Sequence, residues 1–114
     1  MARTAGLEVL KRGGAWAAVD VPVGAADHPL VVNGGDLTEV WTNGRWRSAP
    51  HRVVPVVGAN GASRDRSSAA FFTGPDRDAV VAPIVRPGDA PRFAPTTAGA
   101  HLDAKLAATN TLSS

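Results

Sequence analysis

The stretch "LVVNGGDLTEVWTNGRWRSAPHRVV", residues 30–54, combines three local patterns in one short segment. Residues 30–33 are mostly apolar and end at two glycines, which predicts a short strand. Residues 36–44 have apolar side chains at helical spacing, at Leu37, Val40 and Trp41, which predicts one or two helical turns. Residues 47–57 are rich in valine and predict another strand region. The stretch therefore predicts two short strands on either side of a brief helix.

The ends of these elements carry signals of their own. Asp36 and Glu39 have the spacing of a capping box at a helix N-terminus, and Asn43 with the glycine after it is a typical helix end. Pro50 and Pro55 lie within the second strand region, and proline has no backbone N–H to donate to a neighbouring strand. We therefore expect this strand to be incompletely paired at its edges.

Outside this stretch the chain predicts further short strands and one longer helix. Residues 6–21 alternate apolar and polar side chains around two consecutive glycines, which predicts a β-hairpin. Residues 66–72 and 78–85 predict extended segments, and residues 98–112 predict the longest helix. Many strands followed by a helix argue for an antiparallel β-sandwich or barrel.

Composition excludes several classes of protein. The chain has 114 residues, which fits one domain or a piece of one, and its nine Pro and twelve Gly favour turns and short strands. The absence of cysteine excludes disulfides and thiolate sites and fits a reducing compartment, so we expect a cytoplasmic location. The sequence has no apolar run long enough for a membrane span and no signal-peptide pattern at its start. We therefore expect no membrane association.

Basic and aromatic residues gather around the predicted helix end. Arg45, Arg47 and Arg52 alternate with Trp41 and Trp46, a combination also found in proteins that bind nucleic acid. The alternative is a solvated strand edge with the tryptophans in the core. We favour the second interpretation, because the net charge is only +2 and twelve basic residues are interleaved with ten acidic ones. We therefore expect no nucleic-acid partner.

Three segments in a fixed order carry a family resemblance: residues 30–54, "RSSAAFF" at 66–72 and "GPDRDAVVAPI" at 74–84. They resemble the C-terminal half of the isopenicillin N synthase-like iron(II)/2-oxoglutarate-dependent dioxygenases, and the similarity covers roughly residues 5–109. The matching motifs are Val32-Asn33-Gly34-Gly35-Asp36, Trp41-Thr42-Asn43-Gly44, His51-Arg52-Val53 and Arg66-Ser67-Ser68 before Phe71-Phe72. The resemblance implies a mostly β fold: a partial double-stranded β-helix, or jelly roll, with a C-terminal α-helix. It implies a partial jelly-roll domain at residues 1–94 and a C-terminal helix and tail at residues 95–114.

The resemblance also implies roles for individual residues. Oxygenases of this kind hold iron(II) with two histidines and one carboxylate, and His51 corresponds to the second histidine. Arg66 and Ser68 correspond to the residues that bind the distal carboxylate of 2-oxoglutarate. A guanidinium suits a carboxylate, and residues 66 and 68 of a strand point to the same side. The alternatives are a strand histidine with an ordinary hydrogen bond and an arginine that solubilises a sheet edge. Neither reading assigns a catalytic residue.

The chain departs from the family pattern before Leu7. There the family has a strand with His-x-Asp, the first metal histidine and the carboxylate, and no such strand is expected here. His101 and Asp103 match those letters, but in a helix they lie about 200° apart and are expected on a solvated face. His28 is expected on the surface. The chain also has no tyrosine, so the tyrosine that commonly contacts 2-oxoglutarate in the family is absent.

We therefore expect a non-haem iron(II)/2-oxoglutarate-dependent oxygenase family protein that oxidises a small organic substrate, for example by hydroxylation or desaturation. We expect it as a truncated fragment without the first metal histidine and aspartate, with Fe(II) and 2-oxoglutarate as its cofactors. The alternative is a non-catalytic β-sheet interaction module derived from the same fold. Half of a double sheet has open edges and an uncovered apolar face, so self-association or a complementing chain is expected.

Overall fold

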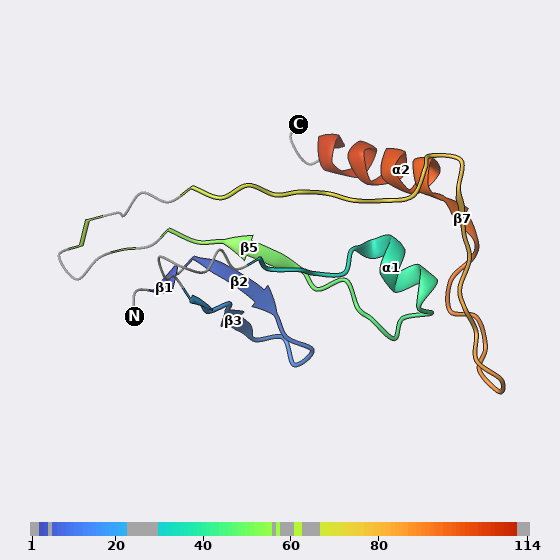
Figure 1. Cartoon of the computed structure of the whole chain (residues 1–114), viewed down its shortest axis with the longest axis horizontal. Coiled ribbons are helices and arrows are strands. Elements are labelled where there is room, and N and C mark those ends of the chain that lie inside the picture. Colours follow the sequence, from blue (N-terminus) through green and yellow to red (C-terminus); the bar gives the residue numbers. More distant parts are fainter. Residues whose placement is uncertain are drawn as a thin grey trace. The chain divides into compact units, whose positions relative to one another are not determined.

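The computed structural model describes residues 3–4, 6–22, 30–55, 57, 61–62 and 67–111. These residues form three small antiparallel sheets and two α-helices (Figure 1). The chain divides into two compact units. Unit 1 contains Met1–Asn33 and Ala49–Ala70, and unit 2 contains Gly34–Ser48 and Phe71–Ser114. The antiparallel pairing and the C-terminal helix agree with the expected mostly β fragment ending in a helix.

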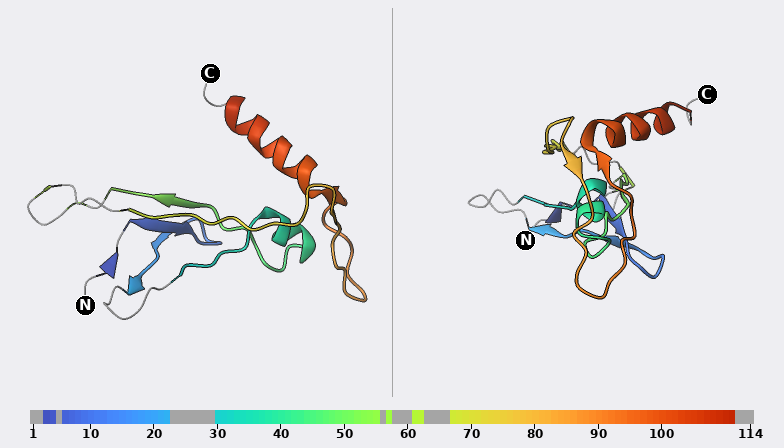
Figure 2. Two further views of the ribbon diagram at one scale, coloured as in Figure 1. Left: turned by 45° about the horizontal axis from the view of Figure 1, so that its top comes forward. Right: turned by 90° about the vertical axis from the view of Figure 1, so that its right-hand side faces the viewer.

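Unit 1 is built around a three-stranded antiparallel sheet in the order β3-β2-β5 (Figures 1 and 2). Its strands are β2 (Leu7–Leu10), β3 (Trp16–Ala18) and β5 (His51–Val53), and a separate pair joins β1 (Arg3–Thr4) to β4 (Val21–Pro22). The predicted hairpin at residues 6–21 is confirmed. Its turn is closed by a hydrogen bond from Lys11 N to Ala15 O of 2.9 Å, and Gly14 adopts a φ of +83°. That left-handed backbone costs glycine least, which explains its place in the turn.

The strand β5 is short and lies at the edge of its sheet. It pairs with β2 through three residues, with His51 opposite Val9 and Val53 opposite Leu7. The ladder continues by one hydrogen bond at each end, from Leu10 N to Pro50 O at 2.9 Å and from Val54 N to Gly6 O at 2.8 Å. Pro50 thus takes part only as an acceptor. The expectation of incomplete pairing beside the prolines is confirmed.

Two predicted strands are absent from the described residues. Residues 30–33 and 67–72 have irregular backbone, and the side chains of Leu30 and Val32 are each 88% exposed. Residue 66, the first of the second predicted strand, lies outside the described residues. An apolar run becomes a strand only where another segment pairs with it and covers its side chains. Within the described chain no segment does so for these two runs, and both predictions are wrong.

Unit 2 contains both helices and one strand pair. Its elements are α1 (Asp36–Trp41), β6 (Val80–Val81), β7 (Thr96–Thr97) and α2 (Ala98–Thr111), which is red in Figure 2. The antiparallel pair β6-β7 leads directly into α2, and α1 packs against β6. The buried hydrophobic side chains of the described residues are Val40, Val81 and Ala98. The core is therefore small and lies where α1, β6 and the start of α2 meet.

The end of α1 follows the prediction, whereas its start does not. Gly35 is the N-cap and no side chain caps the helix, so the predicted capping box of Asp36 and Glu39 is wrong. At the other end, Gly44 N donates to Glu39 O at 2.8 Å and Asn43 N donates to Val40 O at 3.0 Å. With Asn43 at a φ of +53°, this is a Schellman motif that satisfies the last carbonyls of the helix.

Neither helix in the described part of the chain has the length and apolar character needed to cross a bilayer.

Candidate functional site

His51 is the first residue of β5, and its imidazole is exposed. Its Nδ1 lies 3.2 Å from the carbonyl oxygen of Ala49. A carbonyl oxygen only accepts hydrogen bonds, so Nδ1 must carry the proton in this contact. In the neutral ring Nε2 then keeps its lone pair. Histidines that bind metals commonly have this arrangement, with one nitrogen donating to a carbonyl and the other free for the metal.

The register of the sheet in unit 1 gives it two different faces. Residues directly opposite each other in an antiparallel pair lie on the same face, and neighbours along a strand alternate. Val9 pairs with both His51 and Ala17, and Leu7 pairs with Val53. These five residues therefore share one face, and His51 is the only polar residue among the five. The sheet thus presents the imidazole among apolar side chains.

The opposite face of the same sheet carries the charged residues Glu8 and Arg52 next to Trp16. The Arg52 Nε and Nη2 atoms each lie 2.8 Å from Glu8 Oε2. The Arg52 guanidinium also lies over the Trp16 ring, with Cζ 4.1 Å from the ring centroid. Arg52 is thus engaged within its own sheet, as expected of a solvated edge arginine. Trp41 and Trp46 are 54% and 69% exposed, so the prediction that the tryptophans are in the core is wrong.

The other two residues assigned from the sequence are less defined. Ser68 is exposed on irregular backbone rather than on a strand. Arg66 lies outside the described residues, so its assignment to the distal carboxylate of 2-oxoglutarate stays a prediction. Among the described His, Asp and Glu side chains no group of three could hold a metal ion. His51 is therefore the one assigned metal ligand that the described residues contain.

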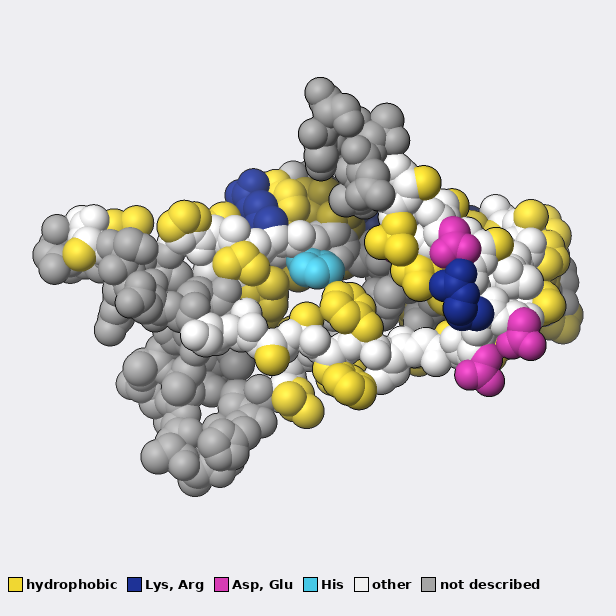
Figure 3. Space-filling model, turned by 90° about the horizontal axis from the view of Figure 1, so that it is seen from above, with side chains coloured by type: hydrophobic (Ala, Val, Ile, Leu, Met, Phe, Trp, Pro, Cys, Tyr) yellow, Lys and Arg dark blue, Asp and Glu magenta, His cyan; other side chains and the backbone are white. Residues whose placement is uncertain are grey.

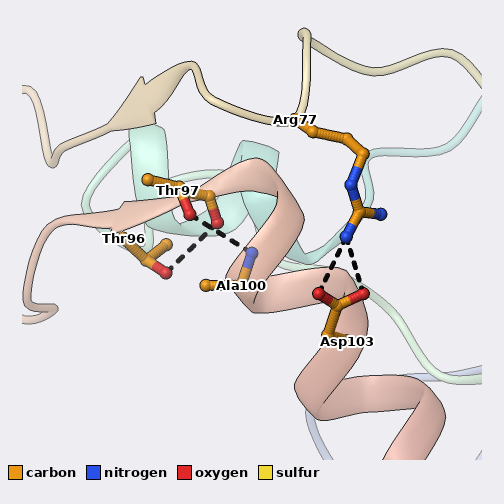
Figure 4. Close-up of polar contacts among 5 residues, drawn as sticks. All are labelled: Arg77, Thr96, Thr97, Ala100 and Asp103. Atoms are coloured by element: carbon orange, nitrogen blue, oxygen red, sulfur yellow. Dashed lines mark hydrogen bonds and ion pairs between the residues drawn. The ribbon is translucent and has the colours of Figure 1, made fainter.

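His101 and Asp103 point to different partners, as helical geometry predicts. Arg77 Nη2 donates to both carboxylate oxygens of Asp103, at 2.9 and 2.8 Å (Figure 4). His101 Nε2 instead lies 3.8 Å from Asp36 Oδ2. The expected solvated face holds for Asp103, which is exposed, but His101 is part-buried. His28, the third histidine, lies outside the described residues.

An ion pair joins the first residue of α1 to α2. Lys105 Nζ lies 2.7 Å from Asp36 Oδ2. The hydrogen bond from Lys105 lowers the pKa of Asp36, assisted by a hydrogen bond from Ser48, and the same contact raises the pKa of Lys105. Asp36 does not cap its own helix, because Gly35 holds the N-cap position and the Asp36 carboxylate pairs with Lys105. No sequence pattern predicts this ion pair, because Asp36 and Lys105 lie far apart in the chain.

A second polar feature that the sequence did not reveal is the side chain of Asn43. It is only 5% exposed. Its Nδ2 donates to Ala90 O at 3.0 Å, and its Oδ1 accepts from Arg92 N at 2.8 Å. The side-chain amide thus donates one hydrogen bond and accepts one, as a backbone peptide group does, and it ties the segment around residue 91 to the end of α1.

Comparisons with known proteins identify the family of this chain. The model of the 2OG-Fe(II) oxygenase superfamily matches residues 2–75. The 1-aminocyclopropane-1-carboxylate oxidase of Persea americana is 46% identical over 81 residues, which is 71% of this chain and 22% of that protein. The 2-oxoglutarate-dependent dioxygenase 11 of Oryza sativa subsp. japonica is 38% identical over 79 residues, 69% of this chain and 19% of that protein. No solved structure matches the chain.

The chain spans about a fifth of the length of these curated relatives. The matched region contains the hairpin, α1, β5 and the Arg66–Ser68 segment, which are the parts that carry the sequence motifs. A family model that covers well over half of the residues shows descent and not a chance likeness of short motifs. The chain belongs to the 2OG-Fe(II) oxygenase superfamily.

Proposed function

We propose that His51 is a metal ligand of an iron(II)/2-oxoglutarate-dependent oxygenase. The observation that carries this proposal is the hydrogen bond from His51 Nδ1 to Ala49 O, with the imidazole on the apolar face of its sheet. This hydrogen bond selects the tautomer that iron(II) needs and limits rotation of the ring. Apolar neighbours on the same face would restrict water around the metal.

We propose that Arg66 and Ser68 hold the distal carboxylate of 2-oxoglutarate. The guanidinium forms two parallel hydrogen bonds with a carboxylate, and the hydroxyl adds a third donor. Bound iron(II) and 2-oxoglutarate supply oxidative decarboxylation coupled to oxidation of a second, small organic substrate. The fold that we propose is part of a jelly roll at residues 1–94, with a helix and tail at 95–114. The lack of cysteine favours a cytoplasmic location.

We propose that catalysis also requires polypeptide from the part of the relatives that this chain does not span. Iron(II) in this class has three protein ligands, and the described residues supply His51 without two further ligands beside it. A single imidazole binds iron(II) weakly. The isolated chain is therefore expected to bind the metal loosely and to release no succinate from 2-oxoglutarate.

Anaerobic titration calorimetry with iron(II), in the presence of 2-oxoglutarate, tests the proposal. The unaltered chain is expected to show weak, saturable binding that His51→Ala abolishes. His101→Ala is the matched control, because it removes the other described imidazole without touching β5. Equal binding by the parent chain and by His51→Ala would contradict the assignment.

A second experiment tests the carboxylate clamp. Succinate release is measured after the chain is mixed with a polypeptide that carries the family's His-x-Asp strand. Arg66→Lys keeps the positive charge but loses the planar fork, so it is expected to raise the KM for 2-oxoglutarate more than it lowers kcat. An unchanged KM would remove Arg66 from the cosubstrate site.

The exposed apolar surface supports a second candidate function, a non-catalytic interaction module. Hydrophobic side chains lie open on the face shown in Figure 3, and in unit 2 Phe71 and Phe72 are each 91% exposed. Surfaces of this kind usually mark contacts with other chains. We propose self-association or a complementing chain at these residues. A sizing column should then show oligomers, whereas a monomer that melts cooperatively would contradict this reading.

A further inference from the structure

A hollow of about 350 Å³ lies in unit 2 beside the end of α1. It is lined by residues of two segments: Asn43, Gly44 and Arg45 at the helix end, and Asp89, Ala90 and Arg92 in the segment after β6. The two segments are far apart in sequence, so the hollow exists only in the folded unit. None of these residues belongs to the proposed iron site.

The walls of the hollow are fixed by hydrogen bonds. Asn43 is buried and bonds to the backbone of Ala90 and Arg92 on the opposite wall, at 3.0 and 2.8 Å. The Schellman motif fixes the other wall, since Gly44 N donates to Glu39 O. The backbone of both walls is thus fixed before a ligand arrives, which lowers the entropic cost of binding.

Two guanidinium groups border the hollow. The Arg92 guanidinium packs against Gly44: its Nη1 lies 2.6 Å from the point where a Cβ at that residue would stand. Within the described part of the chain, this guanidinium makes no hydrogen bond or ion pair. Arg45 Nη1 donates to Ile84 O at 3.1 Å, which leaves other N–H groups of Arg45 available. Asp89 is the only acidic residue among the described residues that line the hollow, so together they carry a net positive charge.

We propose that this hollow binds a compact oxyanion, the phosphate or carboxylate group of a small molecule, through Arg92 and Arg45. Guanidinium groups match the geometry of such oxygens and form charge-assisted hydrogen bonds with them. The backbone N–H groups of residues 43–45 do not contribute, because all three donate to carbonyls of α1 or its C-cap. Asp89 repels the anion and so keeps its affinity moderate.

NMR titration of the isotopically labelled 114-residue chain tests the proposal, with inorganic phosphate and acetate as separate probes. Saturable shifts are expected for the backbone amides of Gly44, Arg45 and Arg92. Arg92→Gln is expected to weaken binding about tenfold, the factor that corresponds to one lost charge-assisted hydrogen bond. Asp89→Asn is expected to strengthen binding several-fold, because it removes the repelling charge.

Arg86→Gln is the matched control. Arg86 is an exposed arginine that precedes the same segment but does not line the hollow, and its replacement removes the same charge. Binding of phosphate alone would assign the hollow to phosphorylated ligands, and binding of both probes would extend it to carboxylates. Binding of acetate alone would restrict it to carboxylates. The proposal is overturned if neither probe saturates, or if Arg86→Gln weakens binding as much as Arg92→Gln.

Discussion

Replacing Asn43 should separate two contributions to the stability of unit 2. The side chain makes two hydrogen bonds to the backbone of residues 90 and 92, and the backbone has a φ of +53°. Asn43→Gly removes the hydrogen bonds but keeps a residue that adopts this φ easily. Asn43→Ala removes the hydrogen bonds and also places a Cβ in the left-handed region. The alanine variant should therefore be the less stable of the two.

The magnitudes follow from general values for each contribution. Each hydrogen bond contributes about 1 kcal/mol net, so Asn43→Gly should lower the free energy of unfolding by about 2 kcal/mol. The left-handed backbone costs an alanine about 1 kcal/mol more, which brings Asn43→Ala to about 3 kcal/mol. Asn43→Asp keeps the acceptor for Arg92 N but loses the donor to Ala90 O, and it should lie between the parent and the glycine variant.

Urea unfolding followed by circular dichroism measures these differences. Asn33→Ala serves as the control, because Asn33 is exposed and its replacement should change the unfolding free energy by less than about 0.5 kcal/mol. Two results would refute the reasoning. Glycine and alanine variants of equal stability would show that the positive φ carries no cost. Losses within the range of the control would show that the amide does not hold the two segments together.

Three further changes test other contacts. A Cβ at Gly99 would lie 2.9 Å from the backbone oxygen of Arg77. Gly99→Ala should therefore lower the free energy of unfolding, measured in urea, by about 1–2 kcal/mol, although alanine has the higher helix propensity. A gain in stability would contradict this prediction. The pKa of Asp36 is lowered from 3.8, so the stability that its ion pair contributes is present above pH 3.8 and is lost as the pH falls below that value. Asp36→Asn should therefore flatten the pH dependence of Tm in that acidic range. An unchanged slope would argue against the ion pair. Arg52→Gln removes a partly exposed ion pair and a cation–π contact, so it should lower the free energy of unfolding by about 1 kcal/mol. The loss should be smaller in high salt, because salt screens the ion pair. A loss that does not depend on salt would point to packing alone.

Local signals predicted the elements whose causes are local. The hairpin, the helix end at Asn43-Gly44 and the C-terminal helix each depend on residues within a few positions of each other, and all three were predicted. The strand at residues 30–33 was predicted wrongly, because strand formation depends on a partner that pattern alone does not identify. The capping box failed because the helix begins one residue earlier than its pattern predicts: Gly35 is the N-cap, and Asp36 lies inside the first turn, where it pairs with Lys105.

In the candidate site, too, the sequence predicted what depends on a local motif and missed what depends on contacts in the folded chain. The motif His51-Arg52-Val53 pointed to the histidine, and the family comparison supports the descent of that motif. The proton position on the ring depends on a carbonyl two residues away and could not be read from the motif. The hollow beside Arg92 was not predicted at all, since it needs two segments brought together by a buried amide.

The Schellman motif at the end of α1 also bears on how the protein ages. Asparagine followed by glycine is prone to deamidation, which begins when the glycine nitrogen attacks the asparagine side-chain carbon. Here the Gly44 N–H donates to Glu39 O, and the Asn43 amide is held by hydrogen bonds at both of its ends. Ring closure therefore has to wait until this corner unfolds. The rate at which Asn43 converts to aspartate and isoaspartate in stored samples thus reports how often this part of unit 2 unfolds.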